Sequence, residues 1–466
     1  MAGVIQWKVR NWRKRFREPP CKRWCCQPVR RRRELRELGQ IVYGDRPQQC
    51  LLTGAGGQGK TSLAGRLAQR LENRGWRVRA YTAAETGNSW SRFLARLQSL
   101  LKDESLRDEV NDELLDCQSE TDVARVWLRA LLQQTGNKLA LVFDNLETLQ
   151  DPATGRITDD AVAAWLDACK PGSDPAPVVL VTSRWAISDW EGDRRVQRPL
   201  GKPLYGDFLR YHQQRGGAPW GVERLRRLYE ALDGNFKGLE FFHGLSQVAG
   251  DDEAFLQQLE HSKKKLQLHM MVEKLVGYLQ PDERELLNRL RAYLAPTFAD
   301  GVRVIAQGLT DPERLLRRLV GLSLVDMEME VTLRLPRYRL SAVVADWLQA
   351  HDPEPASDIR QSAARHQHWI HDYLLRTLDQ ALIAHEALRQ SGLDDEAARF
   401  ALGNIIPYFE LTGLYHMLLK DWLPALRESQ DRTLRAWALN DSGKTCIRVG
   451  QYDEARSYLE ESQTIY

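Results

Sequence analysis

Residues Gly54–Thr61 read G-A-G-G-Q-G-K-T and follow a short apolar segment, Cys50–Thr53. This is the pattern G-x-x-x-x-G-K-[ST], in which glycines let the backbone curl so that successive N–H groups point at phosphate oxygens. A helix that begins near Lys60 would add the positive end of its dipole. The segment therefore predicts a P-loop for a nucleoside tri- or diphosphate. The expected contact residues are Gly54, Gly56, Gly57, Gln58, Gly59, Lys60, Thr61 and Ser62.

An apolar run that ends in an acid supplies the second half of such a site. Leu139–Asp144 reads L-A-L-V-F-D and lies about 80 residues downstream. Thr61 and Asp144 are the predicted metal ligands, since Mg²⁺ keeps several waters and takes few carboxylates. Fast hydrolysis needs a base on the attacking water. Asn145 cannot accept a proton and Glu147 lies further on, so we expect at most a slow ATPase.

Length and composition place the chain among multidomain soluble proteins. It has 466 residues, 43% of them hydrophobic, which is enough for about three or four domains. The sequence shows neither the apolar run of a membrane span nor the pattern of a signal peptide. Its seven cysteines are too few and too scattered for a disulfide framework. A reducing cytoplasm is the expected compartment.

The net charge of +3 hides a strong asymmetry. Residues 1–33 hold twelve Lys and Arg against Glu18 alone, a balance of 12 − 1 = +11, which leaves 54 − 62 = −8 for the rest. Apolar residues recur in this arm at helical spacing, and they are Ile5, Val9, Trp12 and Phe16. Such a helix could contact nucleic acid, an anionic membrane or a partner, or it could pack on the acidic body of the protein.

The alternation of strand-like and helical segments predicts the fold class, an α/β P-loop domain followed by helical units. Parallel strands are expected at Gln49–Thr53, Arg77–Tyr81, Leu139–Asp144 and Val178–Thr182. The predicted domains are a basic arm over 1–36, a P-loop NTPase domain over 37–198, a small helical domain over 199–268, a winged-helix-like domain over 269–350 and tetratricopeptide-like helices over 351–466. The ligand should lie beyond the carboxyl ends of the strands.

Beyond the P-loop domain the pattern is mainly helical. The small helical domain is predicted to contain helices Val222–Ala231, Leu239–Val248 and Asp252–Gln267. The winged-helix prediction depends on helices followed by two short β-like pieces. These segments are Asp282–Tyr293, Pro312–Val320, Ser323–Asp326, Tyr338–Leu340 and a last helix, Ala342–Leu348.

The C-terminal region is predicted to be helical, at Gln361–Gln390, Glu396–Leu411 and Leu423–Ser429. Small and large residues then alternate at the spacing of a tetratricopeptide helix pair. They are Leu439, Gly443, Cys446, Gly450, Tyr452, Ala455, Leu459 and Ser462. An ordinary helical hairpin is the alternative. One repeat cannot bury its own faces, so the earlier helices must supply the stacking surface, and the sequence stops before the repeat is complete, which suggests a truncated array.

Taken together, these segments resemble the STAND class of signalling P-loop ATPases, the NB-ARC- and NACHT-like proteins. The resemblance rests on five short motifs, which are Val29–Leu35, Asp144–Glu147, Thr182–Arg184, Gly234–Leu239 and Tyr338–Ser341. It implies that Arg31 contacts the adenine and that Arg184 senses the γ-phosphate, beside Asp144 and Glu147 as catalytic residues. Phe236 replaces a proline that packs on the adenine. Ser341 replaces a histidine that binds the β-phosphate of ADP.

The resemblance implies an ATP- and ADP-binding molecular switch with Mg²⁺ as its metal, acting in signalling, defence or regulation. The C-terminal helices would bind a protein or peptide ligand, and the ATP-bound form would assemble into a homo-oligomer. Two other functions stay open. One is a nucleic-acid-binding transcriptional regulator with an ATPase switch. The other is a P-loop kinase of a small molecule, for which we find no acceptor constellation in the sequence.

Overall fold

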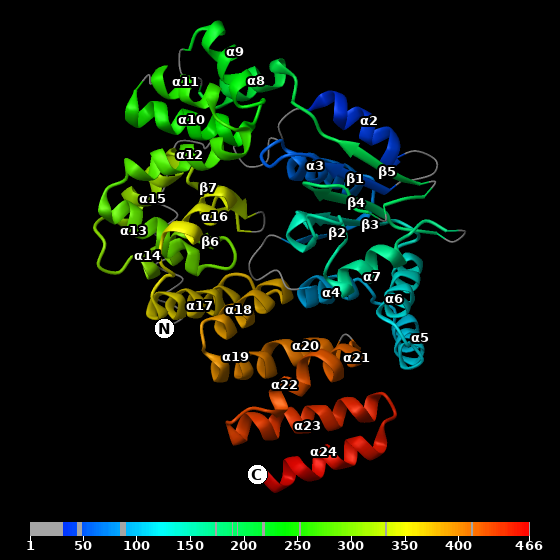
Figure 1. Ribbon diagram of the computed structural model, residues 1–466. Coiled ribbons are helices and arrows are strands. Elements are labelled where there is room, and N and C mark those ends of the chain that lie inside the picture. Colours follow the sequence, from blue (N-terminus) through cyan, green and yellow to red (C-terminus); the bar gives the residue numbers. More distant parts are fainter. Residues whose placement is uncertain are drawn as a thin grey trace.

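The computed structural model describes residues 31–465 except 44–48, 84–89, 173–174, 189, 193, 217–219, 251–252, 331–332 and 412. The apolar stripe predicted for the basic arm lies outside the described residues. In Figure 1 an α/β unit lies beside a helical unit, and the C-terminal helices form rows beneath both. None of the helices in the described ranges combines the length and the apolar character that a membrane crossing requires.

The α/β unit is built on a parallel sheet of five strands in the order β2-β3-β4-β1-β5. The strands are β1 Gln49–Thr53, β2 Arg77–Thr82, β3 Leu139–Asp144, β4 Val178–Ser183 and β5 Arg195–Pro199. The first four confirm the predicted strands, within a residue at their ends. β5 was not predicted. It is an edge strand that reads R-V-Q-R-P, so it lacks the apolar run of a strand buried on both faces.

Helices cover both faces of this sheet, because successive side chains of a strand point to opposite sides. Cys50 and Leu52 of β1 pack with α2 and α3, whereas Leu51 belongs to the cluster on the other face. The helices are α2 Arg32–Tyr43, α3 Lys60–Glu72, α4 Trp90–Gln98, α5 Glu104–Leu115, α6 Glu120–Gln134 and α7 Asp160–Ala168. The parallel strands therefore direct their carboxyl ends to one edge, where the P-loop follows β1.

The helical unit has five helices in its described ranges. They are α8 Tyr205–Gln214, α9 Val222–Ala231, α10 Phe236–Ala249, α11 Glu253–His261 and α12 Lys264–Gly277. The prediction of a single helix over Asp252–Gln267 is wrong. The first helix ends at His261, and Lys263 adopts an extended conformation, with ψ 128°, before the next helix begins. The domain boundary predicted at residue 268 falls inside α12.

The next unit combines helices with a small antiparallel sheet in the order β6-β8-β7. Its elements are α13 Pro281–Arg289, β6 Thr297–Phe298, α14 Ala299–Ile305, α15 Pro312–Gly321, β7 Val325–Glu330, β8 Leu335–Leu340 and α16 Ala342–His351. The two predicted β-like pieces form the β7–β8 hairpin, which pairs Val325 with Leu340 and reaches well into the segment between them. The third strand, β6, was not predicted, because two residues are too few to show a period.

The C-terminal region is mainly helical through Ile465, the last residue that the structure describes. It contains α17 Ser357–Tyr373, α18 Leu378–Gln390, α19 Asp394–Phe400, α20 Ile406–Leu411, α21 Tyr415–Met417, α22 Leu423–Arg427, α23 Arg432–Arg448 and α24 Tyr452–Ile465. The segment predicted as helical over Gln361–Gln390 is two helices, since Thr377 caps a new one with its side chain. In the last pair, a Cβ on Gly443 would lie 2.6 Å from Leu459 Cγ, so these helices pack at the closest approach that glycine allows.

The C-terminal helices pack directly on the α/β unit. One apolar cluster runs from the sheet through α4 and α6 into the region from α18 to α23. Polar contacts border it: Lys420 forms an ion pair with Glu120 at 2.6 Å, and Asn111 Nδ2 donates to the Gly413 carbonyl at 3.1 Å. The α/β unit and the C-terminal helices therefore share one hydrophobic core.

Candidate functional site at the P-loop

The P-loop has the backbone shape that its glycines predict. Gly57 and Gly59 have φ values of 77° and 84°, in the left-handed region that other residues adopt only with strain. α3 begins at Lys60, whose side chain turns back over the loop, and its Nζ donates to the Gly54 carbonyl at 2.7 Å. Lys60 is only 5% exposed, and burial lowers the pKa of its ammonium group. A buried cation on a curled glycine loop suits a phosphate anion.

The acid at the end of β3 lies beside the first turn of α3. Asp144 accepts hydrogen bonds from Thr61 Oγ1, at 2.9 Å, and from the Thr182 hydroxyl at the end of β4. Burial raises the pKa of Asp144, although these two hydroxyls lower it. A buried carboxylate next to a threonine hydroxyl matches the few protein ligands that Mg²⁺ takes. Ser62 follows on the exposed side of α3.

Glu147 and Arg184 form an ion pair next to this acid. Arg184 Nε lies 3.1 Å from Glu147 Oε1, and half of the Arg184 side chain is exposed. The other oxygen, Glu147 Oε2, is buried with no hydrogen-bond partner among the described residues. The structure therefore brings the three predicted catalytic residues to one edge of the sheet. The unpaired oxygen is the acceptor that a water or a substrate hydroxyl could use.

Two further predicted contact residues flank the loop. Arg31 is buried and fully engaged, since its guanidinium donates to the carbonyls of Gln58 and Gly201 and pairs with Glu34. Phe236 is 4% exposed and packs near Gly59. Arg31 therefore positions the loop. The adenine contacts of Arg31 and Phe236 stay predictions.

Ser341 makes its hydrogen bonds away from the P-loop. It precedes α16, where its backbone N–H donates to the Leu324 carbonyl and its own carbonyl accepts from Val344. Within the described part of the chain, we find no contact between Ser341 and the P-loop. Its predicted role at the β-phosphate stays a prediction.

Sequence reasoning missed Asn235 as a residue of this site. Asn235 Nδ2 donates to the Gly56 carbonyl at 2.7 Å, and Asn235 Oδ1 caps α10 by accepting from Gly238 N–H at 3.0 Å. A Cβ on Gly57 would lie 2.4 Å from Asn235 Oδ1, so the two segments touch. The segment Gly234–Leu239 was singled out as a motif, but nothing in the local sequence indicated the contact of Asn235 with Gly56.

A partly buried network of charges connects the segment after Asn235 to the small sheet. Lys237 Nζ pairs with Glu240 at 2.9 Å and with Asp326 of β7 at 2.8 Å, and Arg215 also pairs with Glu240. Burial alone would lower the pKa of Lys237, but Asp326 and Glu240 together raise it. The network therefore joins α8, α10 and β7.

A histidine pair, His212 and His243, lies beside this network. Their ring nitrogens Nδ1 and Nε2 are 3.0 Å apart, and both residues are buried. Burial, His212 and Arg215 lower the pKa of His243 to about 4, against the opposite effect of Glu240. His243 is therefore neutral at physiological pH.

The residues present fit a magnesium nucleotide. Backbone N–H groups of the P-loop and Lys60 would hold the phosphates, and Thr61 with Asp144 would hold Mg²⁺. Among the described residues no group of three or more His, Cys, Asp and Glu side chains is placed to hold a metal ion.

Comparisons with known proteins bear on the domain and the fold. Residues 27–168 match a family model described as an AAA ATPase domain. The search of curated proteins gave no match. Among solved structures, the chain resembles a Signal Transduction ATPase with Numerous Domains (STAND) protein with a tetratricopeptide repeat sensor from Pyrococcus horikoshii. That likeness has a TM-score of 0.56 at 14% identity, over 92% of this chain and 63% of that one.

A second likeness is weaker. The Aeropyrum pernix ORC1 protein, solved in complex with DNA, matches with a TM-score of 0.30 at 15% identity, over 72% of this chain and 95% of that one. A score this low carries no argument about fold or function. The chain spans about two thirds of the length of the STAND protein, or 63%. Residues 27–168 therefore match an AAA ATPase domain, and 92% of the chain shares its fold with the STAND protein from Pyrococcus horikoshii.

Proposed function

We propose that this protein is an ATP- and ADP-binding molecular switch, in which nucleotide exchange changes how the helical units sit on the ATPase domain. The contact between Asn235 and the Gly56 carbonyl carries the proposal. The loop that would hold the phosphates also holds the start of α10. A nucleotide that binds the loop differently in two arrangements therefore shifts the equilibrium between them.

The surroundings of Asp144 favour a slow switch over a fast enzyme. Asn145, which cannot act as a base, follows directly and adopts a left-handed conformation with φ 58°. Glu147 could accept a proton, but one of its oxygens is already paired with Arg184. ATP turnover is therefore slow at most, and the bound nucleotide defines the state of the protein.

The shared core of the ATPase domain and the C-terminal helices supports a sensing role for those helices. A protein or peptide ligand that binds the C-terminal helices would change their packing on α4 to α6. Coupling between two sites is reciprocal, so such a ligand would also change nucleotide affinity. Release of the helices would free surface for self-assembly into a homo-oligomer.

The test compares Lys60→Ala with a matched control, Lys138→Ala, an exposed lysine before β3. Nucleotide content after purification is measured by chromatography, and size-exclusion chromatography is run with ADP and with ATP plus Mg²⁺. We expect wild type and Lys138→Ala to retain nucleotide and to differ in size distribution between ADP and ATP. Lys60→Ala should lose both properties. Retained nucleotide and an unchanged size distribution in Lys60→Ala would refute the switch.

A further inference from the structure

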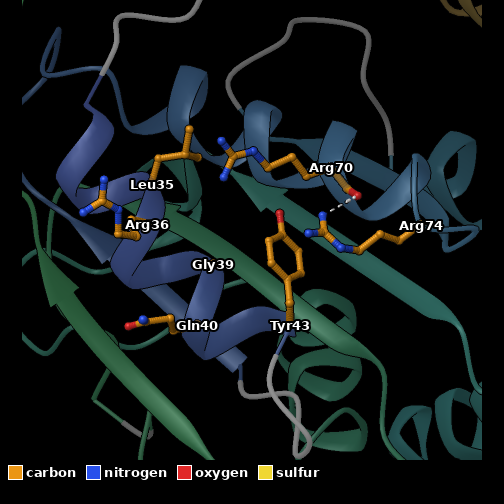
Figure 2. A pocket seen from close by; sticks show the side chains of 7 residues that line it. All are labelled: Leu35, Arg36, Gly39, Gln40, Tyr43, Arg70 and Arg74. Carbon is orange, nitrogen blue, oxygen red and sulfur yellow. Dashed lines mark hydrogen bonds between the residues drawn. The ribbon is translucent and has the colours of Figure 1, made fainter.

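A hollow of about 680 Å³ lies between α2 and α3 on the surface of the ATPase domain (Figure 2). It is lined by Leu35, Arg36, Gly39, Gln40 and Tyr43 of α2, together with Arg70 and Arg74 at the end of α3. Its volume lies in the range of small-molecule sites, roughly 300 to 1,000 Å³.

The hollow is separate from the P-loop. α3 runs for 13 residues from Lys60 at the P-loop, and Arg70 lies in its last turn. A helix of this length spans roughly 20 Å. The two sites therefore lie at opposite ends of the same helix.

Within the described ranges, the arginines of the hollow have no carboxylate paired with them. Arg31 and Arg33 nearby pair with Glu34 and Glu37. Among the described residues, by contrast, we find no carboxylate paired with Arg36, Arg70 or Arg74. Three guanidinium groups gathered around one hollow attract an anion, and their planar forks match the geometry of phosphate.

Tyr43 anchors the wall between the two helices. Its hydroxyl donates to the Leu67 carbonyl at 3.0 Å, and the Arg74 guanidinium lies 4.2 Å from its ring centroid. Arg74 also donates to the Arg70 carbonyl at 3.2 Å, which is the dashed contact in Figure 2. Burial raises the pKa of Tyr43, whereas Arg70 and Arg74 act to lower it, so the charges of both arginines reach the phenol.

Gly39 keeps the floor of the hollow free of side chains. It lies buried inside α2, where glycine is a poor helix former. A Cβ at this position would lie 3.3 Å from Tyr43 Cε2, which is tight for a ring held at its hydroxyl. Alanine would favour the helix here but would crowd the Tyr43 ring.

We propose that this hollow binds the adjacent phosphate groups of a small phosphorylated molecule, of the pyrophosphate or triphosphate class. Two full positive charges, on Arg70 and Arg74, outweigh the partial negative charge of roughly one half at the end of α3. Arg36 supplies a third charge from α2, and Gln40 a neutral amide. Because α3 connects the two sites, occupancy of the hollow is expected to change phosphate affinity at the P-loop.

The experiment uses the full chain with Lys60→Ala, so that the P-loop does not mask binding. Inorganic pyrophosphate and triphosphate are titrated by calorimetry. We expect saturable one-to-one binding, and at least tenfold weaker affinity when Arg36, Arg70 and Arg74 are all replaced by glutamine. The matched control replaces three arginines of α15 (Arg314, Arg317 and Arg318) by glutamine, which removes the same charge elsewhere and should leave affinity within twofold.

A second variant separates binding from folding. Gly39→Ala changes no charge, and its gain in helix propensity offsets the crowding of the Tyr43 ring, so the unliganded protein should melt close to wild type while its affinity for triphosphate falls several-fold. The proposal is overturned if Lys60→Ala binds neither probe at millimolar concentration, or if both arginine triple variants weaken binding equally. Binding of an oligonucleotide alone, with steep salt dependence, would also overturn it. None of these outcomes depends on whether the P-loop acts as a switch.

Discussion

The contact between Asn235 and the P-loop gives the sharpest prediction. Asn235→Ala removes two interactions at once. Loss of the α10 cap costs about 1 kcal/mol, and loss of the hydrogen bond from Nδ2 to the Gly56 carbonyl costs about 1 kcal/mol more. The sum, about 2 kcal/mol, corresponds to a roughly thirtyfold increase in the equilibrium constant for local opening.

Asn235→Ser separates the two contributions. Serine is as good a cap as asparagine, but its hydroxyl is one bond too short to reach Gly56. The serine variant should therefore keep the cap of α10 and lose only the P-loop contact. The free energy of local opening should fall by about 1 kcal/mol, which raises the equilibrium constant for opening roughly fivefold. Asp159→Ala is the matched control, because Asp159 caps α7 through Val162 N–H and is remote from Asn235 in the chain.

Native-state hydrogen exchange read by mass spectrometry measures these opening free energies peptide by peptide. Asn235→Ala should raise exchange in peptides that cover residues 54–62 and 235–240. Asn235→Ser should raise it in the first peptide only, and Asp159→Ala in neither. If exchange over 54–62 is the same in Asn235→Ala and wild type, the contact does not hold the loop and the coupling argument fails.

Three further predictions concern packing and charge. Lys237→Met leaves Glu240 with fewer partners and should lower the free energy of unfolding by about 3 kcal/mol, measured by urea denaturation. Adding Glu240→Gln should recover part of that loss, and no recovery would contradict the pairing. His243 is neutral when folded, because its pKa is lowered to about 4, so protonation of the unfolded chain should reduce stability as the pH falls from about 6.5 to 4. His243→Gln should flatten the denaturation midpoint over that window, and an unchanged pH profile would count against it. Gly443→Ala should destabilise the last helix pair by about 1 to 3 kcal/mol, seen as earlier proteolysis of the C-terminus, and Leu459→Ala in the same chain should relieve it.

The P-loop and its acid could be predicted because each is a local pattern. Gly54–Thr61 encodes its own curl, and the apolar run before Asp144 encodes a buried strand whose end must face the same edge of the sheet. The approach of Thr61 to Asp144 then follows from parallel topology. A site formed by neighbouring elements of one sheet can therefore be predicted from the sequence before the fold is known.

Other features depend on segments that meet only in the folded chain. The motif around Asn235 was recognised, but its contact with Gly56 is set by how the helical unit docks. β5 is polar because it lies at an edge. The break near Lys263 carries no proline or glycine, so helical periodicity continued through it.

The arginines of α2 and α3 illustrate the same limit. In sequence, Arg36, Arg70 and Arg74 are three charged positions among many. Only the packing of the two helices places them around one hollow and shows that acidic partners are missing there among the described residues. Charge counts locate a basic region, but they do not locate a site.

The continuous apolar cluster between α4, α6 and the C-terminal helices has a consequence for how this protein can be cut or switched. A fragment that ends near residue 355 would expose the apolar faces of α4 and α6 to water, and it should precipitate or require detergent to stay in solution. The same holds in the cell for any activated form in which these helices swing away. If the protein is the switch proposed above, activation and assembly have to be simultaneous, because an exposed apolar surface of this kind must be buried again as soon as the helices leave it.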